Sequence, residues 1–430
     1  MTARHPRLQQ ASWWLLVAGI TSFVVLSAQT LAWLGVPYDL PVGGKWAKLH
    51  LGSWLVLLSL ICALWADGQP LAEAWRRVQA MRLVALALAC MVTVAAWSVA
   101  RSGTSGAAFI IDALWVPCLV LLAMQGATVA QRRALLCWLM ALLVLNALLA
   151  LGEFVAGRTL VPRYALEPDL VADEGFFRAT ALMGHPLANA LQTLTLMPAA
   201  LLLPARWRWS VAGLLLIALL PFGSRSALAA ALLVYGGALV TSVLWRALHG
   251  RYSYLQLTGG LFLCLVLLTA GGIAAWASGL GERIFANLTW DQSANARLVA
   301  WDALSWLDDE AWFAGVSPAQ ISDIALRIGL DPRFEAIENF WVVLLMQFGL
   351  VGFLPFLLGL GALLLHLWRQ AVPAMRLAML VYLVVASGAN TLASKTASLT
   401  LLAVGMACSS AWRSSADVHR APRAAQGTTA

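Results

Sequence analysis

Long apolar runs separated by short polar segments extend along most of the chain. Because about 20 consecutive apolar residues are needed to cross a bilayer as a helix, this pattern predicts an all-α, polytopic membrane protein with about 12 transmembrane helices. The predicted spans cover residues 13–34, 51–66, 83–100, 107–126, 132–155, 180–203, 209–223, 227–246, 255–278, 340–366, 375–392 and 397–412. The first run is too long for the apolar part of a signal peptide and lacks a clear cleavage site, so we expect it to be a span.

One polar interval, residues 279–338, interrupts the pattern for 60 residues and is rich in Asp and Glu. A connection between neighbouring spans needs only a few residues, so we expect this stretch to be a folded, functional loop. The predicted organisation is therefore helices 1–9 within residues 1–278, the loop at 279–338, helices 10–12 within 339–412, and a polar tail at 413–430. We expect the tail to be disordered.

The distribution of basic residues predicts the orientation of the chain in the membrane. With the N-terminus inside, the inside segments hold 16 Lys and Arg against three Asp and Glu, whereas the outside segments hold 12 against 15. Both termini and the tail are therefore predicted to be cytoplasmic, and the 60-residue loop extracytoplasmic. This bias also accounts for the net charge of +8, so the expected partner is a lipid bilayer and not nucleic acid.

The composition excludes several other classes of protein. Only 11% of the residues are charged, against roughly 25% in soluble domains. All six cysteines fall inside apolar runs, which predicts neither a disulfide framework nor a metal site. No period of 20–50 residues repeats, and the two halves show no inverted similarity, which weakens a transporter interpretation.

Polar residues gather at the predicted outer ends of the spans, and no comparable group exists at the cytoplasmic ends. The group comprises Asp112, Glu153, Arg178, His185, Arg225, Glu338, Asn339, Asn390 and Lys395. Ionisable residues in or beside a span are functional candidates because they are expensive to bury in lipid. A transporter would be expected to hold polar groups near the midplane, so the chemistry is predicted to lie at the outer leaflet.

Three arginines, Arg178, Arg225 and Arg297, suit a lipid phosphate group, because a guanidinium binds phosphate oxygens through two parallel hydrogen bonds and stays charged. Each could instead snorkel to the interface or pair with a nearby acid. Glu338 could be a general base for a hydroxyl acceptor, or a carboxylate that complements the dipole of a helix N-terminus.

The remaining polar candidates have two interpretations each. His185 precedes Pro186 and could face a ligand or be structural, with the structural role slightly favoured. Asp112 and Glu153 are expected to be partners of the arginines and not catalysts. Most of the 21 tryptophans are expected in interfacial belts, whereas Trp301 and Trp312 in the loop could stack on sugar rings.

Five segments, in order, resemble those of bacterial O-antigen ligases and O-antigen polymerases. Arg178-Ala-Thr-Ala-Leu-Met-Gly184-His185-Pro186 is similar to their Arg-x-Thr/Ser-Gly-x-x-Gly-His/Asn-Pro stretch, and Ser224-Arg225-Ser226-Ala227 to their Ser-Arg-Gly/Ser-Ala turn. Arg297 to Trp301 resembles the Arg-x-x-x-Trp that opens their periplasmic loop, and Trp312-Phe-Ala-Gly315-Val316 resembles Pro-Leu-Phe-Gly-Val-Gly. Glu338-Asn339-Phe340-Trp341 and Phe348-Gly349-Leu350-Val351-Gly352 resemble His-Asn-x-Tyr/Phe and Gly-Leu-x-Gly. The match covers about residues 175–360.

This resemblance implies a metal-independent, cofactor-free inverting glycosyltransferase with an all-helical C-type fold in the bacterial inner membrane. Its active site would face the periplasm beneath a large helical periplasmic loop. It would transfer glycan from an undecaprenyl-diphosphate carrier to a glycan or lipid-linked acceptor. By position, Arg225 and Arg297 would bind the diphosphate with Arg178 nearby, Glu338 would activate the acceptor, and His185, Asn339 and Trp301 would contact substrate.

Two further comparisons bear on the function. Ligases carry a histidine at the position of Glu338, so the carboxylate favours polymerisation of O-antigen or exopolysaccharide repeat units over transfer to lipid A-core. The alternatives from other classes are a polysaccharide or lipid-linked oligosaccharide transporter and a non-catalytic assembly protein of the cell envelope. If the protein is an enzyme, we expect Arg178, Arg225, Arg297 and Glu338 to converge on one outward-facing cavity beneath the loop.

Overall fold

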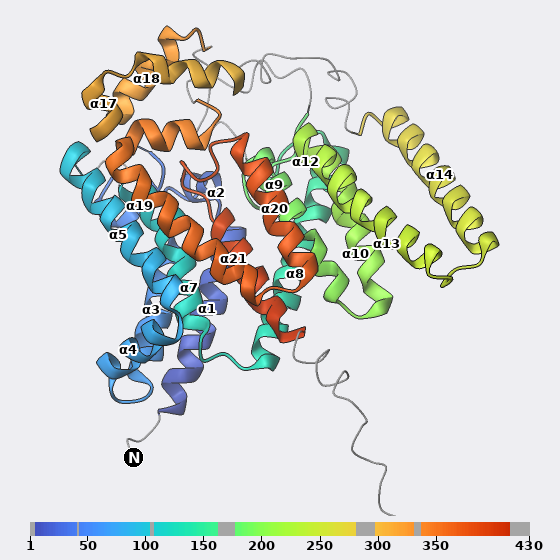
Figure 1. Ribbon diagram of the computed structural model, residues 1–430, viewed down its shortest axis with the longest axis horizontal. Coiled ribbons are helices and arrows are strands. Elements are labelled where there is room, and N and C mark those ends of the chain that lie inside the picture. The colour runs from blue at the N-terminus through green and yellow to red at the C-terminus, as the bar shows by residue number, and fades with distance from the viewer. Residues whose placement is uncertain are drawn as a thin grey trace, which may run out of the picture.

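The computed structural model describes residues 5–40, 43–103, 107–161, 177–280, 297–330 and 337–412. Every regular element in these ranges is a helix, and they contain no β-strand (Figure 1). The predicted all-α class is therefore confirmed for the described part of the chain. The predictions for the tail at 413–430 lie outside the described residues, as do those for loop residues 281–296 and 331–336.

The helices follow one another with short connections. The N-terminal part contains α1 (Pro6–Val25), α2 (Ala28–Trp33), the 3-10 helix η1 (Lys45–Lys48), α3 (Leu51–Trp65), α4 (Pro70–Ala80), α5 (Arg82–Ser102), α6 (Ala107–Phe109), the π-helix η2 (Ile110–Trp115), α7 (Val116–Met124) and α8 (Val129–Ala156). The middle part contains α9 (Pro186–Leu196), η5 (Met197–Leu202), α10 (Ala205–Ile217), α11 (Leu219–Phe222), α12 (Arg225–Ala230), η6 (Ala231–Gly236), α13 (Gly237–Leu248) and α14 (Tyr254–Ala277). The loop contains η7 (Ala300–Trp306), α17 (Asp309–Ala314) and α18 (Pro318–Arg327), and the C-terminal part contains α19 (Phe340–Gln370), α20 (Pro373–Ser387), α21 (Ser398–Ser409) and η9 (Ser410–Trp412).

Each of the twelve predicted spans is helical over most of its length, but the helices differ in length. By length and composition, seven helical segments among the described residues could cross a membrane, or eight if the bent pair α3–α4 counts as one. Two of the remaining helices, α20 and α21, are shorter, at 15 and 12 residues. These findings support a multi-pass membrane protein, and the number of twelve spans stays a prediction.

Several predicted spans are interrupted by local features that an apolar pattern does not reveal. Ser27 divides the first one, because its hydroxyl accepts a 3.1 Å hydrogen bond from the Thr30 amide and starts α2. The 109° bend between α3 and α4 follows the second predicted span and leaves it intact. The sixth predicted span begins as a helix only at Pro186, since residues 177–185 are not helical. The predicted start at residue 180 is therefore wrong by six positions.

The helices pack around α21, whose twelve residues are all buried. It contacts α7, α8 and α9, while α5 lies along α19 and α1 along α3. Helices α1 and α3 can approach closely because both carry glycine at the contact: a methyl group on Gly52 would lie 2.8 Å from the Gly19 carbonyl oxygen. In contrast, α13 and α14 stand at the edge of the molecule with mostly exposed side chains (Figure 1).

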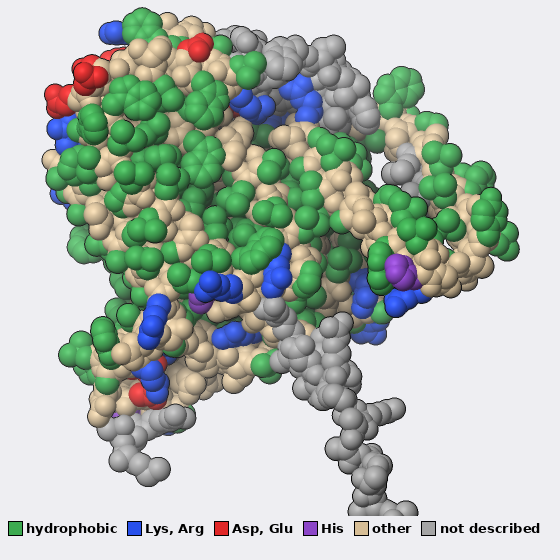
Figure 2. All heavy atoms as spheres, in the orientation of Figure 1, with side chains coloured by type: hydrophobic (Ala, Val, Ile, Leu, Met, Phe, Trp, Pro, Cys, Tyr) green, Lys and Arg blue, Asp and Glu red, His purple; other side chains and the backbone are tan. Residues whose placement is uncertain are grey.

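The described loop elements lie at one end of the molecule, opposite the start of α1 and α4 (Figure 1). There they form a small apolar core with the first turns of α19, to which Ala303, Ile324 and Met346 belong. Figure 2 shows Lys and Arg side chains towards both ends of the molecule and a broad, mainly hydrophobic band between them. This distribution is typical of a protein whose middle is surrounded by lipid.

Two glycines allow the loop to cross α19 at close range. Gly315 has φ +80° and Gly349 has φ +58°, conformations that are open to glycine and strained for other residues. A methyl group on Gly349 would lie 2.3 Å from the Phe313 carbonyl oxygen, and one on Gly315 would lie 2.7 Å from the Gly349 nitrogen. The crossing therefore requires glycine at both positions.

The break in α19 at Gly349 is stabilised from outside the helix. The Met346 carbonyl accepts a 2.7 Å hydrogen bond from the Val316 amide of the loop. The Phe348 carbonyl accepts a 2.9 Å hydrogen bond from the Trp97 indole of α5. These bonds join the loop, α5 and α19, and so they fix the first turns of α19, directly after the predicted site residues Glu338 and Asn339.

Candidate active site

An ion pair joins the loop to the start of α19. The Nη2 atom of Arg297 lies 3.1 Å from Oε2 of Glu338, and the two side chains are 32% and 24% exposed. The Nε atom of Arg297 donates a 2.8 Å hydrogen bond to the carbonyl oxygen of Gly388, directly after α20. The guanidinium is therefore held from two sides and remains partly accessible to a ligand.

The capping hydrogen bonds of α19 come from Asn339 and not from Glu338. The Oδ1 atom of Asn339 accepts hydrogen bonds from the backbone amides of Trp341 and Val342, at 3.1 and 3.4 Å. Glu338 instead forms the ion pair with Arg297 of the loop. The alternative that its carboxylate complements the dipole of α19 stays a prediction beside this contact. Asn339 is 7% exposed, and its predicted contact with substrate stays a prediction beside this structural role.

Two other predicted arginines, Arg178 and Arg225, lie at one turn. Arg225 is the first residue of α12, and the preceding Ser224 hydroxyl accepts a 3.4 Å hydrogen bond from the Ala227 amide. Arg178 is 8% exposed, and its Nε donates a 3.3 Å hydrogen bond to the Phe222 carbonyl oxygen, three residues before Arg225. Arg178 thus supports the turn from which Arg225 projects.

Helix α20 connects the two groups of arginines. The carbonyl of Gly388 holds Arg297, and the body of α20 contacts α9 and α12, the helix that Arg225 starts. The convergence of the four predicted residues on one cavity stays a prediction. A cavity of about 250 Å³ lies elsewhere, between α1, the α3–α4 turn and the α7–α8 turn, with Glu73 and Arg77 among its lining residues.

The predicted substrate-contacting residues differ in exposure. His185 is exposed and directly precedes α9, without capping it through its side chain. Trp301 lies in η7, four residues after Arg297, and is 54% exposed. Trp312 is half-buried and packs against the small core of the loop. An exposed indole near a cation offers a flat apolar surface for a sugar ring, so Trp301 remains the better stacking candidate.

The expectation that Glu153 pairs with an arginine is wrong. Within the described residues, its Oε2 accepts hydrogen bonds from the backbone amides of Thr180 and Ala181, at 2.8 and 2.9 Å. Its Oε1 accepts one from the Leu160 amide at 2.5 Å. A buried carboxylate thereby satisfies the amides of the non-helical segment that carries Arg178, and its role is structural.

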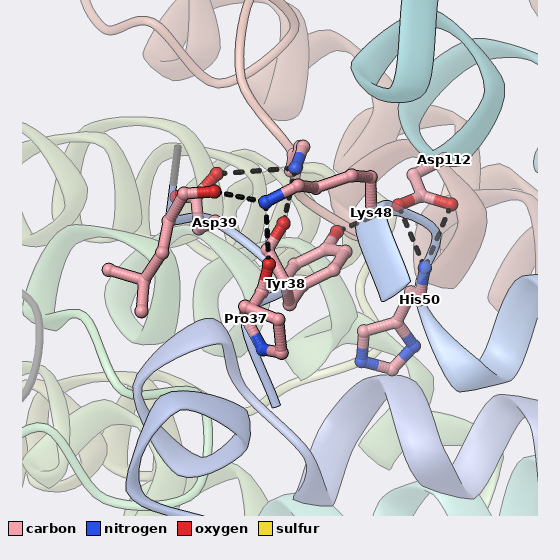
Figure 3. Close-up of polar contacts among 8 residues, drawn as sticks. Pro37, Tyr38, Asp39, Lys48, His50 and Asp112 are labelled. Carbon is pink, nitrogen blue, oxygen red and sulfur yellow. Dashed lines mark hydrogen bonds and ion pairs between the residues drawn. The ribbon is translucent and has the colours of Figure 1, made fainter. Parts of the chain in front are cut away.

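Asp112 is also bound by partners other than arginine (Figure 3). Its Oδ2 accepts hydrogen bonds from the Tyr38 hydroxyl at 2.8 Å and from the His50 amide at 3.1 Å. Its Oδ1 accepts a 2.5 Å hydrogen bond from the Ser53 hydroxyl. Asp112 is 2% exposed, so these donors replace water around a buried carboxylate. The sequence does not reveal this cluster, because Tyr38, His50 and Ser53 follow no shared spacing.

The cluster folds the loop between α2 and α3, which is predicted to face outward. The Nδ1 atom of His50 accepts a 3.0 Å hydrogen bond from the Gly52 amide, and its Nε2 lies 2.6 Å from the Leu26 carbonyl oxygen. Burial lowers the pKa of His50, which suits this neutral tautomer. Burial, together with the neighbouring Asp112, raises the pKa of Tyr38, so its hydroxyl keeps its proton and stays a donor.

The chain matches no protein-family model, and a search of curated proteins finds no similar protein. The functional interpretation therefore depends on the site residues themselves. In the part of the chain that the structure describes, no three His, Cys, Asp or Glu side chains are grouped as metal ligands would be. The chemistry that these residues offer is that of guanidinium and carboxylate groups.

Proposed function

We propose that the protein is a membrane glycosyltransferase that acts at the periplasmic face of a bacterial inner membrane. Its donor is a glycan linked to undecaprenyl diphosphate, and its acceptor is a sugar hydroxyl. Its product is a polymer of O-antigen or exopolysaccharide repeat units. The observation that carries the proposal is the Arg297–Glu338 pair, a guanidinium and a carboxylate 3.1 Å apart at the base of the loop.

The two groups suit the two halves of a glycosyl transfer. The acceptor oxygen forms a bond to C1 of the donor sugar while the bond from C1 to the diphosphate oxygen breaks, which inverts the anomeric carbon. Glu338 takes the proton of the acceptor hydroxyl as general base. Arg297 and Arg225 stabilise the negative charge that develops on the departing lipid diphosphate, because each guanidinium can bind two phosphate oxygens at once.

The ion pair also couples donor binding to base catalysis. Without donor, Nη2 of Arg297 is directed at the carboxylate of Glu338, while Nε is retained by the Gly388 carbonyl. A diphosphate that binds Arg297 competes with the Glu338 carboxylate for the N–H groups on this edge of the guanidinium. Once the diphosphate has bound the guanidinium, the carboxylate can accept the proton of the acceptor. The base is thus released only when a donor is present.

The nearby residues have supporting roles in this proposal. Arg178 holds the turn that presents Arg225, through its hydrogen bond to Phe222. Trp301, which is 54% exposed, stacks on a sugar ring of the donor or the acceptor. Histidine occupies the position of Glu338 in the ligases that the chain resembles, so a polymerase is favoured over transfer to lipid A-core.

The test is a reconstituted reaction in lipid nanodiscs. The protein is incubated with undecaprenyl-diphosphate-linked repeat units, with and without lipid A-core. We expect a ladder of polymer on the lipid carrier in both mixtures. A product that forms only on lipid A-core would identify a ligase, and the absence of any new glycosidic bond in either mixture would overturn the proposal.

Three variants connect this activity to the site. Arg297→Lys and Arg225→Lys keep the positive charge and lose the planar fork, so each should lower turnover while the protein still inserts and folds. The matched control is Arg327→Lys, in an exposed arginine of the same loop that lies over the Trp306 ring at 5.6 Å. Normal turnover in both site variants would exclude diphosphate binding by these arginines.

A further inference from the structure

The N-terminal end of the turn between α20 and α21 contacts the proposed catalytic pair. The Gly388 carbonyl accepts the 2.8 Å hydrogen bond from Nε of Arg297. The next carbonyl, that of Ala389, accepts a 3.2 Å hydrogen bond from the amide of Phe340, two residues after the proposed base. Because the turn holds the arginine by one carbonyl and the start of α19 by the next, its course sets the distance between the two charged groups.

Lys395 fixes the other end of the same turn. Its Nζ donates a 2.6 Å hydrogen bond to the Tyr38 carbonyl and lies 3.5 Å from the Asp39 carboxylate. The same ammonium lies 4.6 Å from the centre of the Tyr38 ring. The Lys395 side chain is only 16% exposed, so these contacts are largely screened from water and more favourable than they would be at an open surface.

The outer loop that receives Lys395 is anchored within the helix bundle (Figure 3). The Tyr38 hydroxyl donates to the Asp112 carboxylate, and the two residues are 3% and 2% exposed. Lys48 closes the loop on itself, because its Nζ donates to the carbonyls of Pro37 and Leu40. Buried, hydrogen-bonded groups such as Tyr38 and Asp112 hold one conformation, so the described part of the loop is a fixed support for the turn.

We propose that Lys395 is a positioning residue for the Arg297–Glu338 pair. The contacts run from the buried Asp112 through Tyr38 to Lys395, and then along the turn to Gly388. The catalytic part of this inference rests on the proposed function, whereas its structural part does not.

The Lys395–Asp39 ion pair is not the contact that carries the proposal. Asp39 is 49% exposed, and exposed ion pairs contribute little to stability. The hydrogen bond to the Tyr38 carbonyl and the contact with its ring are the interactions that fix the turn. A residue that keeps both contacts should therefore hold the turn as lysine does. A residue that only fills the same space should not.

The structural test is hydrogen–deuterium exchange of the protein in nanodiscs. Lys395→Met removes the ammonium and keeps the unbranched apolar stem, whereas Lys395→Arg keeps a cation that can reach the same carbonyl and ring. We expect exchange in peptides covering residues 337–341 and 388–397 to be at least tenfold faster in the Met variant and close to wild type in the Arg variant. The control is Lys45→Met, in an exposed lysine of the same outer loop, which should change neither peptide.

The catalytic test uses the same variants in the polymerisation assay. We expect kcat of Lys395→Met to fall about 10- to 100-fold with little change in the donor KM, because a misplacement of about 1 Å in a catalytic group has an effect of this size. Lys395→Arg should restore most of the rate. Faster exchange with unchanged kcat would overturn the catalytic part of the inference.

Unchanged exchange in both peptides of Lys395→Met would overturn the structural part. If that variant does not fold, Tyr38→Phe tests the support of the loop that receives Lys395, since it removes the hydroxyl that binds Asp112 and keeps the carbonyl and ring that Lys395 contacts. It should also accelerate exchange in the 388–397 peptide, and unchanged exchange there would count against the proposal. If the wild-type protein makes no glycan, the proposed function fails, and the exchange measurement still decides whether Lys395 positions the turn.

Discussion

Arg297 and Glu338 are 41 positions apart in the chain, and their side chains form a 3.1 Å ion pair where the loop meets α19. The pair is partly exposed, so it contributes little to stability by itself. Arg297 is also held by a backbone carbonyl, and Asn339 caps the helix next to Glu338. Neighbouring groups therefore hold both residues in place, and the proposed function assigns ligand binding to the partly exposed pair.

Replacing Glu338 by Gln should separate donor binding from turnover. Gln keeps the shape of the side chain and cannot take the acceptor proton, so the rate of polymer formation should fall by about 10²- to 10⁴-fold. Arg297 loses its negative partner, so the donor should bind at least as tightly as it does to wild type. Both quantities can be measured in nanodiscs, with undecaprenyl diphosphate as the ligand for the binding experiment.

Glu310→Gln is the matched control for that variant. Glu310 is an exposed carboxylate of α17 in the loop, and it pairs with Arg101 of α5 at 3.3 Å. Its substitution should leave both donor affinity and turnover unchanged. Polymer of normal length and amount from Glu338→Gln would exclude the general-base role, and weaker donor binding would contradict the competition for Arg297.

The helices were predictable from the sequence because an apolar run and a basic-residue bias are local properties of the chain. The breaks were not, since each depends on hydrogen bonds with particular partners. Ser27 starts a new helix by accepting one amide, and Gly349 allows a break that the loop and Trp97 then stabilise. A hydropathy pattern does not contain these partners.

The site residues likewise divide into features that the sequence predicts and contacts that it does not. The gathering of polar residues at one end could be predicted, because charge is rarely placed beside a span without a reason. Individual partners could not, since Glu153 and Asp112 are bound by backbone amides and hydroxyls that come from distant parts of the chain. The negative charge of Glu153 and Asp112 suggested only that each would pair with an arginine.

Alanine at Gly315 or Gly349 should destabilise the contact between the loop and α19. The backbone angles are φ +80°, ψ 172° at Gly315 and φ +58°, ψ −179° at Gly349. This region is open almost only to glycine, and occupying it with another residue costs about 1–3 kcal/mol. Because the added methyl group would also meet backbone atoms at 2.4 and 2.3 Å, we expect a clear fall in the unfolding temperature of each variant.

Gly361→Ala provides the comparison within the same helix. A methyl group there meets no atom within 4 Å, so alanine should be neutral or should stabilise α19 by up to about 1 kcal/mol through its better helix propensity. Thermal unfolding in one detergent gives all three values. Equal unfolding temperatures for the three variants would contradict the proposed crossing of the loop over α19.

The stability of the loop between α2 and α3 should decrease as the pH falls below about 6.5, the ordinary pKa of histidine. Burial lowers the pKa of His50 in the folded protein, although the Leu26 carbonyl and the Asp112 carboxylate partly offset this. The unfolded chain therefore binds more protons between the folded and the ordinary pKa, so protonation favours unfolding in that window. Protonation would also place a proton on Nδ1 of His50, which could then no longer accept the hydrogen bond from the Gly52 amide.

His50→Asn isolates this contribution, because asparagine can still cap α3 and does not titrate. Unfolding temperatures measured from pH 7.5 to pH 5 should fall less steeply for the variant than for wild type. Other titrating groups affect both proteins equally and cancel in the difference. Parallel curves for the two proteins would exclude His50 as the source of the pH dependence.

The orientation of the chain can be tested by cysteine labelling, with exposed Cys137 replaced by Ser. Ala319 is exposed on α18, and Ala72 is exposed on α4 at the opposite end of the molecule (Figure 1). Ala319 is a better site than Ser317, whose hydroxyl caps α18. Ala319→Cys should react with an impermeant maleimide in intact spheroplasts, and Ala72→Cys only after permeabilisation, because basic residues favour the cytoplasmic side. The reverse result would move Arg297 and Glu338 to the cytoplasmic face, where a donor in the outer leaflet could not reach them.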